Sequence, residues 1–168
     1  MKKYAIILAA GKGTRMKSDL PKCAYPFCGK PMINYIIESC KKASIDEIVC
    51  VVGYKAEKVI ECLPSDVKYV FQTEQLGTGH ATKCAYDALQ GKEGLTLIFP
   101  GDMPLIDSET IEGIINKHVE SQNDLTLATS IIKDPQCYGR IYRENGNVKK
   151  IVEFKDCNEE QKKIREIN

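Results

Sequence analysis

The sequence lacks several features that would place it in a particular class at once. Its 168 residues include eight cysteines, but no two cysteines have C-x-x-C spacing, and there are only two histidines. Both absences argue against a zinc site. The cysteines are scattered along the chain, as Cys40, Cys50 and Cys62 illustrate. We therefore expect reduced thiols in the core of a cytosolic protein rather than a disulfide framework.

The sequence also has little net charge and no long apolar run. A formal charge of +1 gives no indication of a nucleic-acid or membrane surface. The short apolar run that follows Met1-Lys2-Lys3-Tyr4 lacks the apolar core and cleavage site of a signal peptide, and no stretch could span a membrane. We find no repeat, linker or low-complexity tract. These observations favour one soluble, cytoplasmic domain.

Two well-known glycine motifs are absent. No G-x-x-x-x-G-K-[ST] string occurs, and a dinucleotide-binding G-x-G-x-x-G would need glycine where Met16 stands. Instead, the apolar run Ile6–Ala10 ends at Gly11 and Gly13, close to the cations Lys12, Arg15, Lys17 and Lys22. This pattern predicts a buried strand followed by a phosphate-binding loop. The alternative is an ordinary turn that needs its glycines for geometry alone.

Strand-like and helix-like segments alternate along the chain. We expect an α/β fold of the Rossmann-like type, with a mostly parallel sheet, helices on both faces and a β-hairpin near the C-terminus. The hairpin turn is predicted at Asn145-Gly146, and Asp107 is expected to cap a helix. The expected helices span about 31–40, 55–63, 81–90 and 107–120, with a short one from 158, and the expected strands about 6–10, 47–52, 67–71, 95–99, 124–132 and 148–154.

Two polar segments follow predicted strands at the sheet edge where open α/β folds bind ligands. The first, 72–81, begins with Gln72, whose amide offers both a donor and an acceptor to a nucleobase. The second carries Asp102, a carboxylate that could hold Mg²⁺. Local features alone leave simpler alternatives: a plain loop with capping residues for 72–81, and a turn-forming role for Asp102. For Glu153, they favour a solvated strand residue.

Several longer strings resemble one enzyme family. Leu8–Met16 with Pro21-Lys22 resembles the signature of sugar-phosphate nucleotidyltransferases. The segment 72–81 is similar to the uracil-contacting loop of the bacterial N-acetylglucosamine-1-phosphate uridylyltransferases, the N-terminal domains of enzymes that are also acetyltransferases. Cys137–Ile141 and Val152-Glu153 resemble the sugar-binding half of the same family. The resemblance covers nearly the whole chain. One departure is Pro100, where the family often has an aromatic residue.

The resemblance implies a Mg²⁺-dependent reaction of UTP with N-acetylglucosamine 1-phosphate. The products would be pyrophosphate and UDP-N-acetylglucosamine, a precursor of the peptidoglycan cell wall. It implies catalytic roles for Arg15 and Lys22 and a metal role for Asp102. For His80 it implies a structural role or a place beside the nucleotide rather than a catalytic one. The substrate-binding residues that it implies are Leu8, Ala10, Gly11, Gly13, Gln72, Gly77, Thr78, Gly139, Glu153 and Asn168.

The family's nucleotidyltransferase domain extends some tens of residues beyond position 168. That part carries an asparagine that completes the metal site, and a left-handed β-helix with acetyltransferase activity and trimer contacts follows it. We therefore expect residues 1–168 to be a single, C-terminally incomplete nucleotidyltransferase domain without the β-helix, of impaired activity. Two further hypotheses are an enzyme for another sugar 1-phosphate and a non-catalytic module that binds nucleotide sugars.

Overall fold

The fold is known from a computed structural model, which describes residues 1–13, 16 and 18–168. The chain forms two compact units, Met1–Gly113 and Ile114–Asn168. In the described part of the chain, no helix has the length and apolarity needed to cross a membrane.

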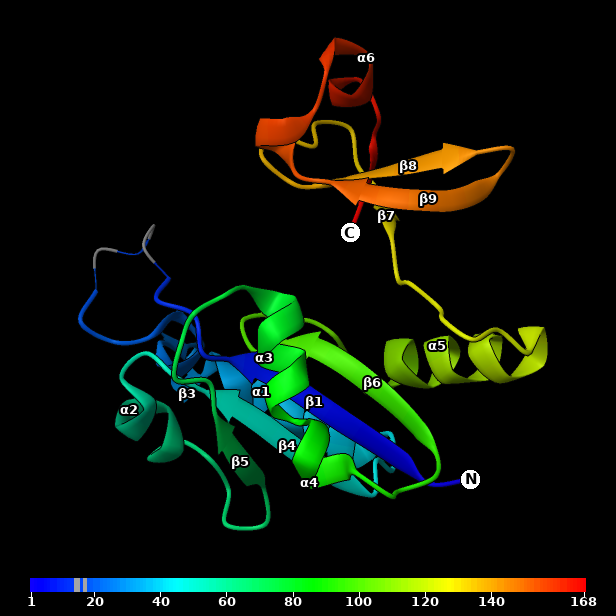
Figure 1. Ribbon diagram of the computed structural model, residues 1–168. Coiled ribbons are helices and arrows are strands. Elements are labelled where there is room, and N and C mark those ends of the chain that lie inside the picture. The colour runs from blue at the N-terminus through cyan, green and yellow to red at the C-terminus, as the bar shows by residue number, and fades with distance from the viewer. Residues whose placement is uncertain (14–15, 17) are drawn as a thin grey trace. The chain divides into compact units, whose positions relative to one another are not determined.

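The first unit is built on a four-stranded parallel sheet in the order β5-β4-β1-β6 (Figure 1). The central strand β1 pairs in parallel with β4 on one side and with β6 on the other. Strands β1 and β4 are nearly continuous apolar runs, as expected for strands that are covered on both faces. The strands are β1 (Lys3–Ala9), β4 (Glu47–Val52), β5 (Lys68–Phe71) and β6 (Leu95–Pro100).

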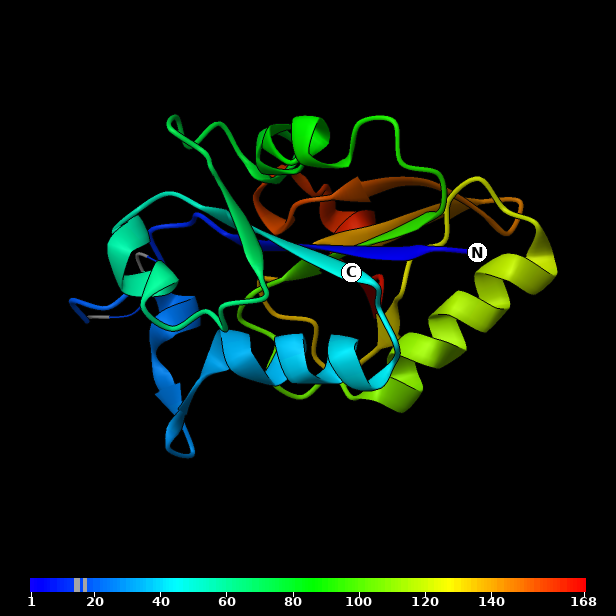
Figure 2. The same ribbon diagram turned by 90° about the horizontal axis from the view of Figure 1, so that it is seen from below.

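Helices cover both faces of this sheet (Figures 1 and 2). Helix α1 (Met32–Lys42) lies on one face and buries Ile33, Ile36, Ile37 and Cys40, which recur at helical spacing. Helices α3 (Thr78–Cys84) and α4 (Tyr86–Leu89) lie on the other face. Shorter elements surround the sheet: η1 (Lys22–Ala24), β2 (Pro26–Phe27), β3 (Lys30–Pro31) and α2 (Ala56–Ile60).

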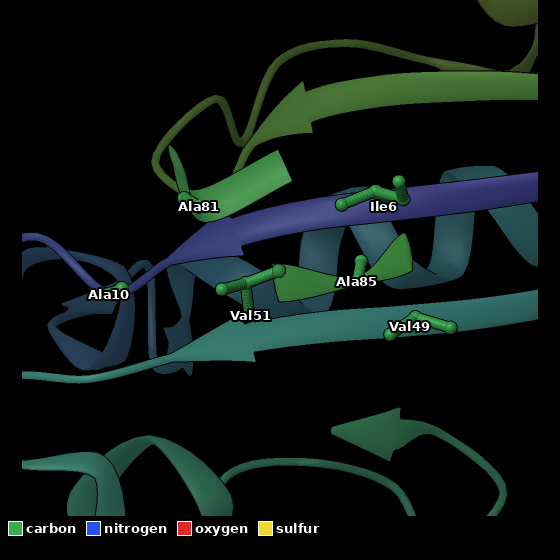
Figure 3. Close-up of a cluster of buried hydrophobic side chains, with 6 residues drawn as sticks. All are labelled: Ile6, Ala10, Val49, Val51, Ala81 and Ala85. Carbon is green, nitrogen blue, oxygen red and sulfur yellow. The ribbon is translucent and has the colours of Figure 1, made fainter. Parts of the chain in front are cut away.

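A cluster of buried side chains holds α3 on the sheet (Figure 3). Ile6 and Val51 come from the two central strands, whereas Ala81 and Ala85 come from α3 and the residue after it. Because Ala81 and Ala85 have small side chains, the backbone of this segment can lie close to the strands. The start of α3 is thereby fixed near the carboxyl ends of β1 and β4.

Helix α5 (Ser108–Ser121) contains the boundary between the two units. Asp107 caps it: the Asp107 Oδ1 accepts a hydrogen bond of 2.8 Å from the Thr110 backbone N–H. This confirms the capping role predicted for Asp107.

The second unit contains an antiparallel sheet in the order β7-β10-β8-β9, so the mostly parallel α/β fold with an antiparallel C-terminal part is confirmed. Asn145 and Gly146 both have positive φ, 50° and 82°, as a two-residue hairpin turn requires. Asn158 and Gln161 form the predicted capping box. The elements are β7 (Ser130–Ile131), β8 (Arg140–Glu144), β9 (Asn147–Val152), η2 (Phe154–Asp156), α6 (Glu159–Lys162) and β10 (Glu166–Ile167).

Two segments differ from the sequence prediction. The helix expected over 81–90 begins earlier, at Thr78, because Gly77 with φ 98° turns the chain directly into the helix. It also divides at Ala85 into α3 and α4. The β-rich run 124–132 forms a strand only at its end, where it pairs with β10. Leu125 is 83% exposed and belongs to no strand, so its β propensity finds no sheet to pack on.

The backbone at Gly53 lies close to two other segments of the first unit, at Ala10 and Gln72. A Cβ atom there would lie 2.9 Å from both the Ala10 Cβ and the Gln72 carbonyl oxygen. We predict that Gly53→Ala lowers the free energy of unfolding by about 1–3 kcal/mol, since the backbone must move to admit the methyl group. Urea denaturation followed by circular dichroism measures this.

Gly113→Ala is the matched control, because Gly113 lies inside α5 with nothing within 4 Å of its would-be Cβ. It should be neutral or stabilise by about 0.5–1 kcal/mol. Equal stability changes for the two variants would contradict the close packing at Gly53.

Candidate active site

A pocket of about 330 Å³ opens at the carboxyl edge of the parallel sheet, within the first unit. It is formed by the end of β1 and the loop after it, by η1, by the segment between β5 and α3, and by the end of β6. Many residues predicted from the sequence meet here. The lining residues are Leu8, Ala9, Ala10, Gly11, Gly13, Lys22, Cys23, Gln72, Gln75, Gly77, Thr78, Ala81, Pro100 and Asp102.

Backbone hydrogen bonds continue beyond the strand ends and hold the pocket segments together. The Gly101 N–H donates to the Leu8 carbonyl at 2.9 Å, and the Gln72 N–H donates to the Val52 carbonyl at 2.7 Å. A third bond, of 3.1 Å, runs from the Tyr54 N–H to the Ala10 carbonyl. The residues that follow β1, β4, β5 and β6 are therefore parts of one hydrogen-bonded edge.

Lys22 and Asp102 form an ion pair in this pocket, with 2.5 Å between Nζ and Oδ2. Lys22 begins η1, whose next residues Cys23 and Ala24 are buried, so its backbone is anchored. The two side chains are 45% and 33% exposed. A pair this exposed is worth about 0–1 kcal/mol. The pair can therefore separate, so that Lys22 binds a phosphate and Asp102 binds a metal ion.

The glycine loop approaches Lys22 closely. Gly13 has φ 59°, and a Cβ atom at Gly13 would lie 3.1 Å from the Lys22 Cβ. Glycine meets both the conformational and the spatial demand at this position. Arg15, the second residue for which the sequence predicts a catalytic role, lies outside the described residues.

The segment between β5 and α3 is arranged around the Gln72 side chain, which is only 4% exposed. Its Nε2 donates to the Gly77 carbonyl at 3.1 Å and lies 3.0 Å from the His80 Nδ1. Gln75 adds a hydrogen bond of 3.3 Å from its Nε2 to the Gln72 carbonyl. The contact of Gln75, and the partner of His80, were not predicted from the sequence, because a spacing of three or eight residues across an irregular segment carries no periodic signal.

Cys23 lines the pocket but is not a nucleophile. Burial, together with the nearby Asp102 carboxylate, raises the pKa of the Cys23 thiol to about 11. Thiols are nucleophilic as thiolates, so this group is inert near neutral pH. All eight cysteines are free, as expected, but the expectation that they lie in the core is only partly met, because Cys28 and Cys137 are exposed.

Three predicted site residues belong to the second unit. Gly139 and Asn168 are neighbours there: a Cβ atom at Gly139 would lie 2.6 Å from the Asn168 Oδ1. A larger residue at position 139 would require the Asn168 side chain to move. Glu153 is exposed at the point where β9 passes into η2.

Arg140 fixes the chain just before Gly139, a role that the sequence analysis did not foresee. Its side chain is buried, and its guanidinium donates to the backbone carbonyls of Tyr138, Gln136 and Pro135. The guanidinium carbon lies 5.4 Å from the centre of the Phe154 ring. A buried arginine that bonds carbonyls holds the preceding loop in one conformation.

Residues 5–155 match the family described as the MobA-like NTP transferase domain. The chain belongs to this family. Proteins named Bifunctional protein GlmU are similar to it over its whole length: 52% identical in Clostridium perfringens and Clostridium beijerinckii, and 50% in Acholeplasma laidlawii. The chain spans 37% of the length of each of these relatives. The resemblance predicted from the sequence is confirmed.

Three solved structures share the fold of this NTP transferase domain. A UDP-glucose pyrophosphorylase complexed with UDP-glucose has a TM-score of 0.75 at 22% identity, over 99% of this chain and 73% of that chain. A Methanothermobacter nucleotidyl transferase has a TM-score of 0.60 at 23% identity, over 68% and 57%. The manganese complex of Rv0371c from Mycobacterium tuberculosis has a TM-score of 0.58 at 18% identity, over 69% and 59%.

In the second unit, an ion pair anchors the strand that leads to Asn168. Glu166 of β10 accepts two hydrogen bonds from Arg143 of β8, 2.8 Å from Nε and 2.7 Å from Nη2, and a third of 2.7 Å from Thr129. Hydrogen bonding to Arg143, and to a smaller extent to Thr129, lowers the pKa of Glu166 from its ordinary 4.5 to about 2.

This depressed pKa predicts an acid-dependent loss of stability in the second unit. The carboxylate contributes its full stabilisation above about pH 4.5 and loses it as the pH falls toward about 2. Glu166→Gln should lower the free energy of unfolding by about 1–2 kcal/mol at pH 7 and flatten its dependence on pH below 4.5. Denaturation at a series of pH values measures this.

Glu159→Gln is the control, because its partner Lys162 is only three residues away and its carboxylate is 85% exposed. It should change stability by less than about 0.5 kcal/mol. If Glu166→Gln kept the parent's pH dependence, the ion pair would not hold β10.

Proposed function

We propose that this domain transfers a uridylyl group from UTP to N-acetylglucosamine 1-phosphate, giving UDP-N-acetylglucosamine and pyrophosphate. Family membership and the similarity to GlmU proteins over the whole chain support the proposal. The observation that carries it is the pocket itself, where a glycine loop, the Lys22–Asp102 pair and the buried amide of Gln72 meet at one edge of the sheet.

The proposed reaction is an in-line displacement at the α-phosphorus of UTP. A phosphate oxygen of the sugar phosphate forms a bond to that phosphorus, the bond from it to the oxygen bridging the β-phosphate breaks, and pyrophosphate leaves. Both reactants are anions, so the protein's task is to align them and to neutralise charge. We assign this task to Lys22 and to the backbone of Gly11 and Gly13, which line the pocket, and to Arg15 from the sequence.

Asp102 fits a divalent cation that arrives with the nucleotide. In the described part of the chain, no three His, Cys, Asp or Glu side chains gather into a metal site of their own. Mg²⁺, however, is commonly held by one or two carboxylates together with waters and substrate phosphates. Asp102 is a part-exposed carboxylate in the pocket and fits that donor set. A cation bound there would offset the charge on the phosphoryl oxygens.

The candidate contacts to the amino-sugar come from the sequence resemblance. They are the backbone of Gly139, the exposed Glu153 carboxylate and the Asn168 amide next to Gly139. We propose that residues 1–168 act as one nucleotidyltransferase domain. Such a domain would produce a cell-wall precursor from UTP, a cytoplasmic nucleotide.

Pyrophosphate release tests the proposed chemistry. With UTP, N-acetylglucosamine 1-phosphate and Mg²⁺, Lys22→Ala and Asp102→Ala should each lower kcat/KM by about 10²-fold or more, because each removes charge stabilisation at the reacting phosphates. Lys41→Ala and Asp66→Ala are the matched controls, since they break an exposed lysine–aspartate pair of 2.7 Å outside the pocket. The controls should keep the parent's activity.

Other results would select another function. Faster turnover of glucose 1-phosphate would indicate an enzyme for a different sugar. UTP binding without pyrophosphate release would indicate a non-catalytic module. Full activity of Asp102→Ala, or unchanged Mn²⁺ binding by that variant in the presence of UTP, would contradict the metal assignment.

A further inference from the structure

The Gly77 carbonyl determines which way the Gln72 amide points. A carbonyl oxygen only accepts hydrogen bonds, so the atom of Gln72 that lies 3.1 Å from it must be the amide nitrogen. The amide has two N–H groups, and this contact uses one. The assignment of Nε2 and Oε1 is therefore fixed by a chemical requirement of the neighbouring backbone.

The second N–H of Gln72 determines the protonation of His80. The same Nε2 lies 3.0 Å from the His80 Nδ1, and two donors cannot form a hydrogen bond with each other. The Nδ1 must then be the acceptor, which requires a neutral ring that carries its proton on Nε2. His80 is thereby matched to one orientation of the amide.

Gln72 Oε1 remains as an acceptor on a residue that lines the pocket. Both N–H groups are used by Gly77 and His80, and among the described residues no donor hydrogen-bonds to Oε1. Gln72 lines the pocket, whereas His80 does not. His80 can therefore act on the pocket through its contact with the Gln72 amide.

An acceptor in this position distinguishes the two pyrimidine bases. Uracil in a nucleotide has one N–H, at N3, and this donor matches Oε1. Cytosine has an unprotonated N3 that is itself an acceptor, so the two acceptors would face each other without a hydrogen bond. The free-energy cost of leaving a buried polar group unpaired exceeds the net gain from one hydrogen bond. A site of this kind therefore discriminates well between a ligand that forms the hydrogen bond and one that does not.

We propose that His80 is a positioning residue for nucleobase selection: it holds the Gln72 amide with Oε1 toward the base, so that the pocket accepts uracil and rejects cytosine. The inference rests on the proposed function in one respect, that the ligand is a pyrimidine nucleotide. It assigns His80 a role beyond the structural one expected from the sequence.

The tautomer of His80 is the first test, and it needs no ligand. The chain has only two histidines, so a ¹⁵N-histidine-labelled sample gives two rings, and His118→Gln identifies the remaining signals as those of His80. The spectra are recorded in mildly alkaline buffer, at about pH 8. We expect an unprotonated Nδ1 and a protonated Nε2 for His80. A protonated Nδ1 would overturn the proposal.

The second test is the ratio of the dissociation constants of CTP and UTP, measured by competition binding to the full chain. His80→Phe keeps an aromatic ring but removes the acceptor, and the ratio should fall by about tenfold, equivalent to the loss of one hydrogen bond. His80→Asn, whose side-chain oxygen can take the place of Nδ1, should restore most of it. His118→Phe is the matched control and should leave the ratio unchanged.

The outcomes separate the two proposals. A parent chain that prefers UTP, with the same preference in a folded His80→Phe variant, contradicts the role of His80 alone. Loss of UTP affinity in His80→Phe without a change in the ratio also contradicts it, because a merely structural role would weaken both nucleotides equally. A parent chain that binds neither nucleotide, or binds both equally, contradicts the proposed function and base selection together.

Discussion

The register of the parallel sheet is the constraint on which the candidate site depends. β1 lies between β4 and β6, with Ala9 opposite Val52 and Leu8 opposite Pro100. Because all four strands run in the same direction, the chain leaves each strand at the same edge. The glycine loop, Gln72 and Asp102 are far apart in sequence, yet this one geometric fact brings them to a single pocket. A shift of one residue between β1 and β6 would displace Asp102 from Lys22.

Close backbone approach then determines which residues can stand at that edge. Gly53 lies against Ala10 and the Gln72 carbonyl, and Gly101 lies against the Leu8 carbonyl. Side chains at these positions would separate the strand ends. The candidate site residues therefore lie on loops whose backbones are hydrogen-bonded to neighbouring strands. These hydrogen bonds give the loops the rigidity that a binding site needs.

The sequence predicted much of this architecture for reasons that can be named. Apolar runs bounded by glycine or proline located β1, β4 and β6, and helical spacing of Ile33, Ile36 and Ile37 located α1. It could not locate the start of α3, which depends on the φ of Gly77, or the end of the 124–132 run, which depends on whether a partner strand is available. Propensity is local, whereas these boundaries are set by tertiary contacts.

The site residues divide in the same way, and the division reflects how they work. Lys22 was predictable because it lies close to a glycine loop, and Asp102 because it lies just after a predicted strand. Their pairing is exposed enough to exchange for substrate groups. The Gln72 amide is the opposite case: its two N–H groups are already committed to Gly77 and His80 before any ligand arrives. Phosphate binding needs a cationic side chain that is free to move to the phosphate. Base recognition needs an acceptor whose orientation is fixed. The sequence shows which residues carry charge, but only the three-dimensional contacts show which amide is held fixed.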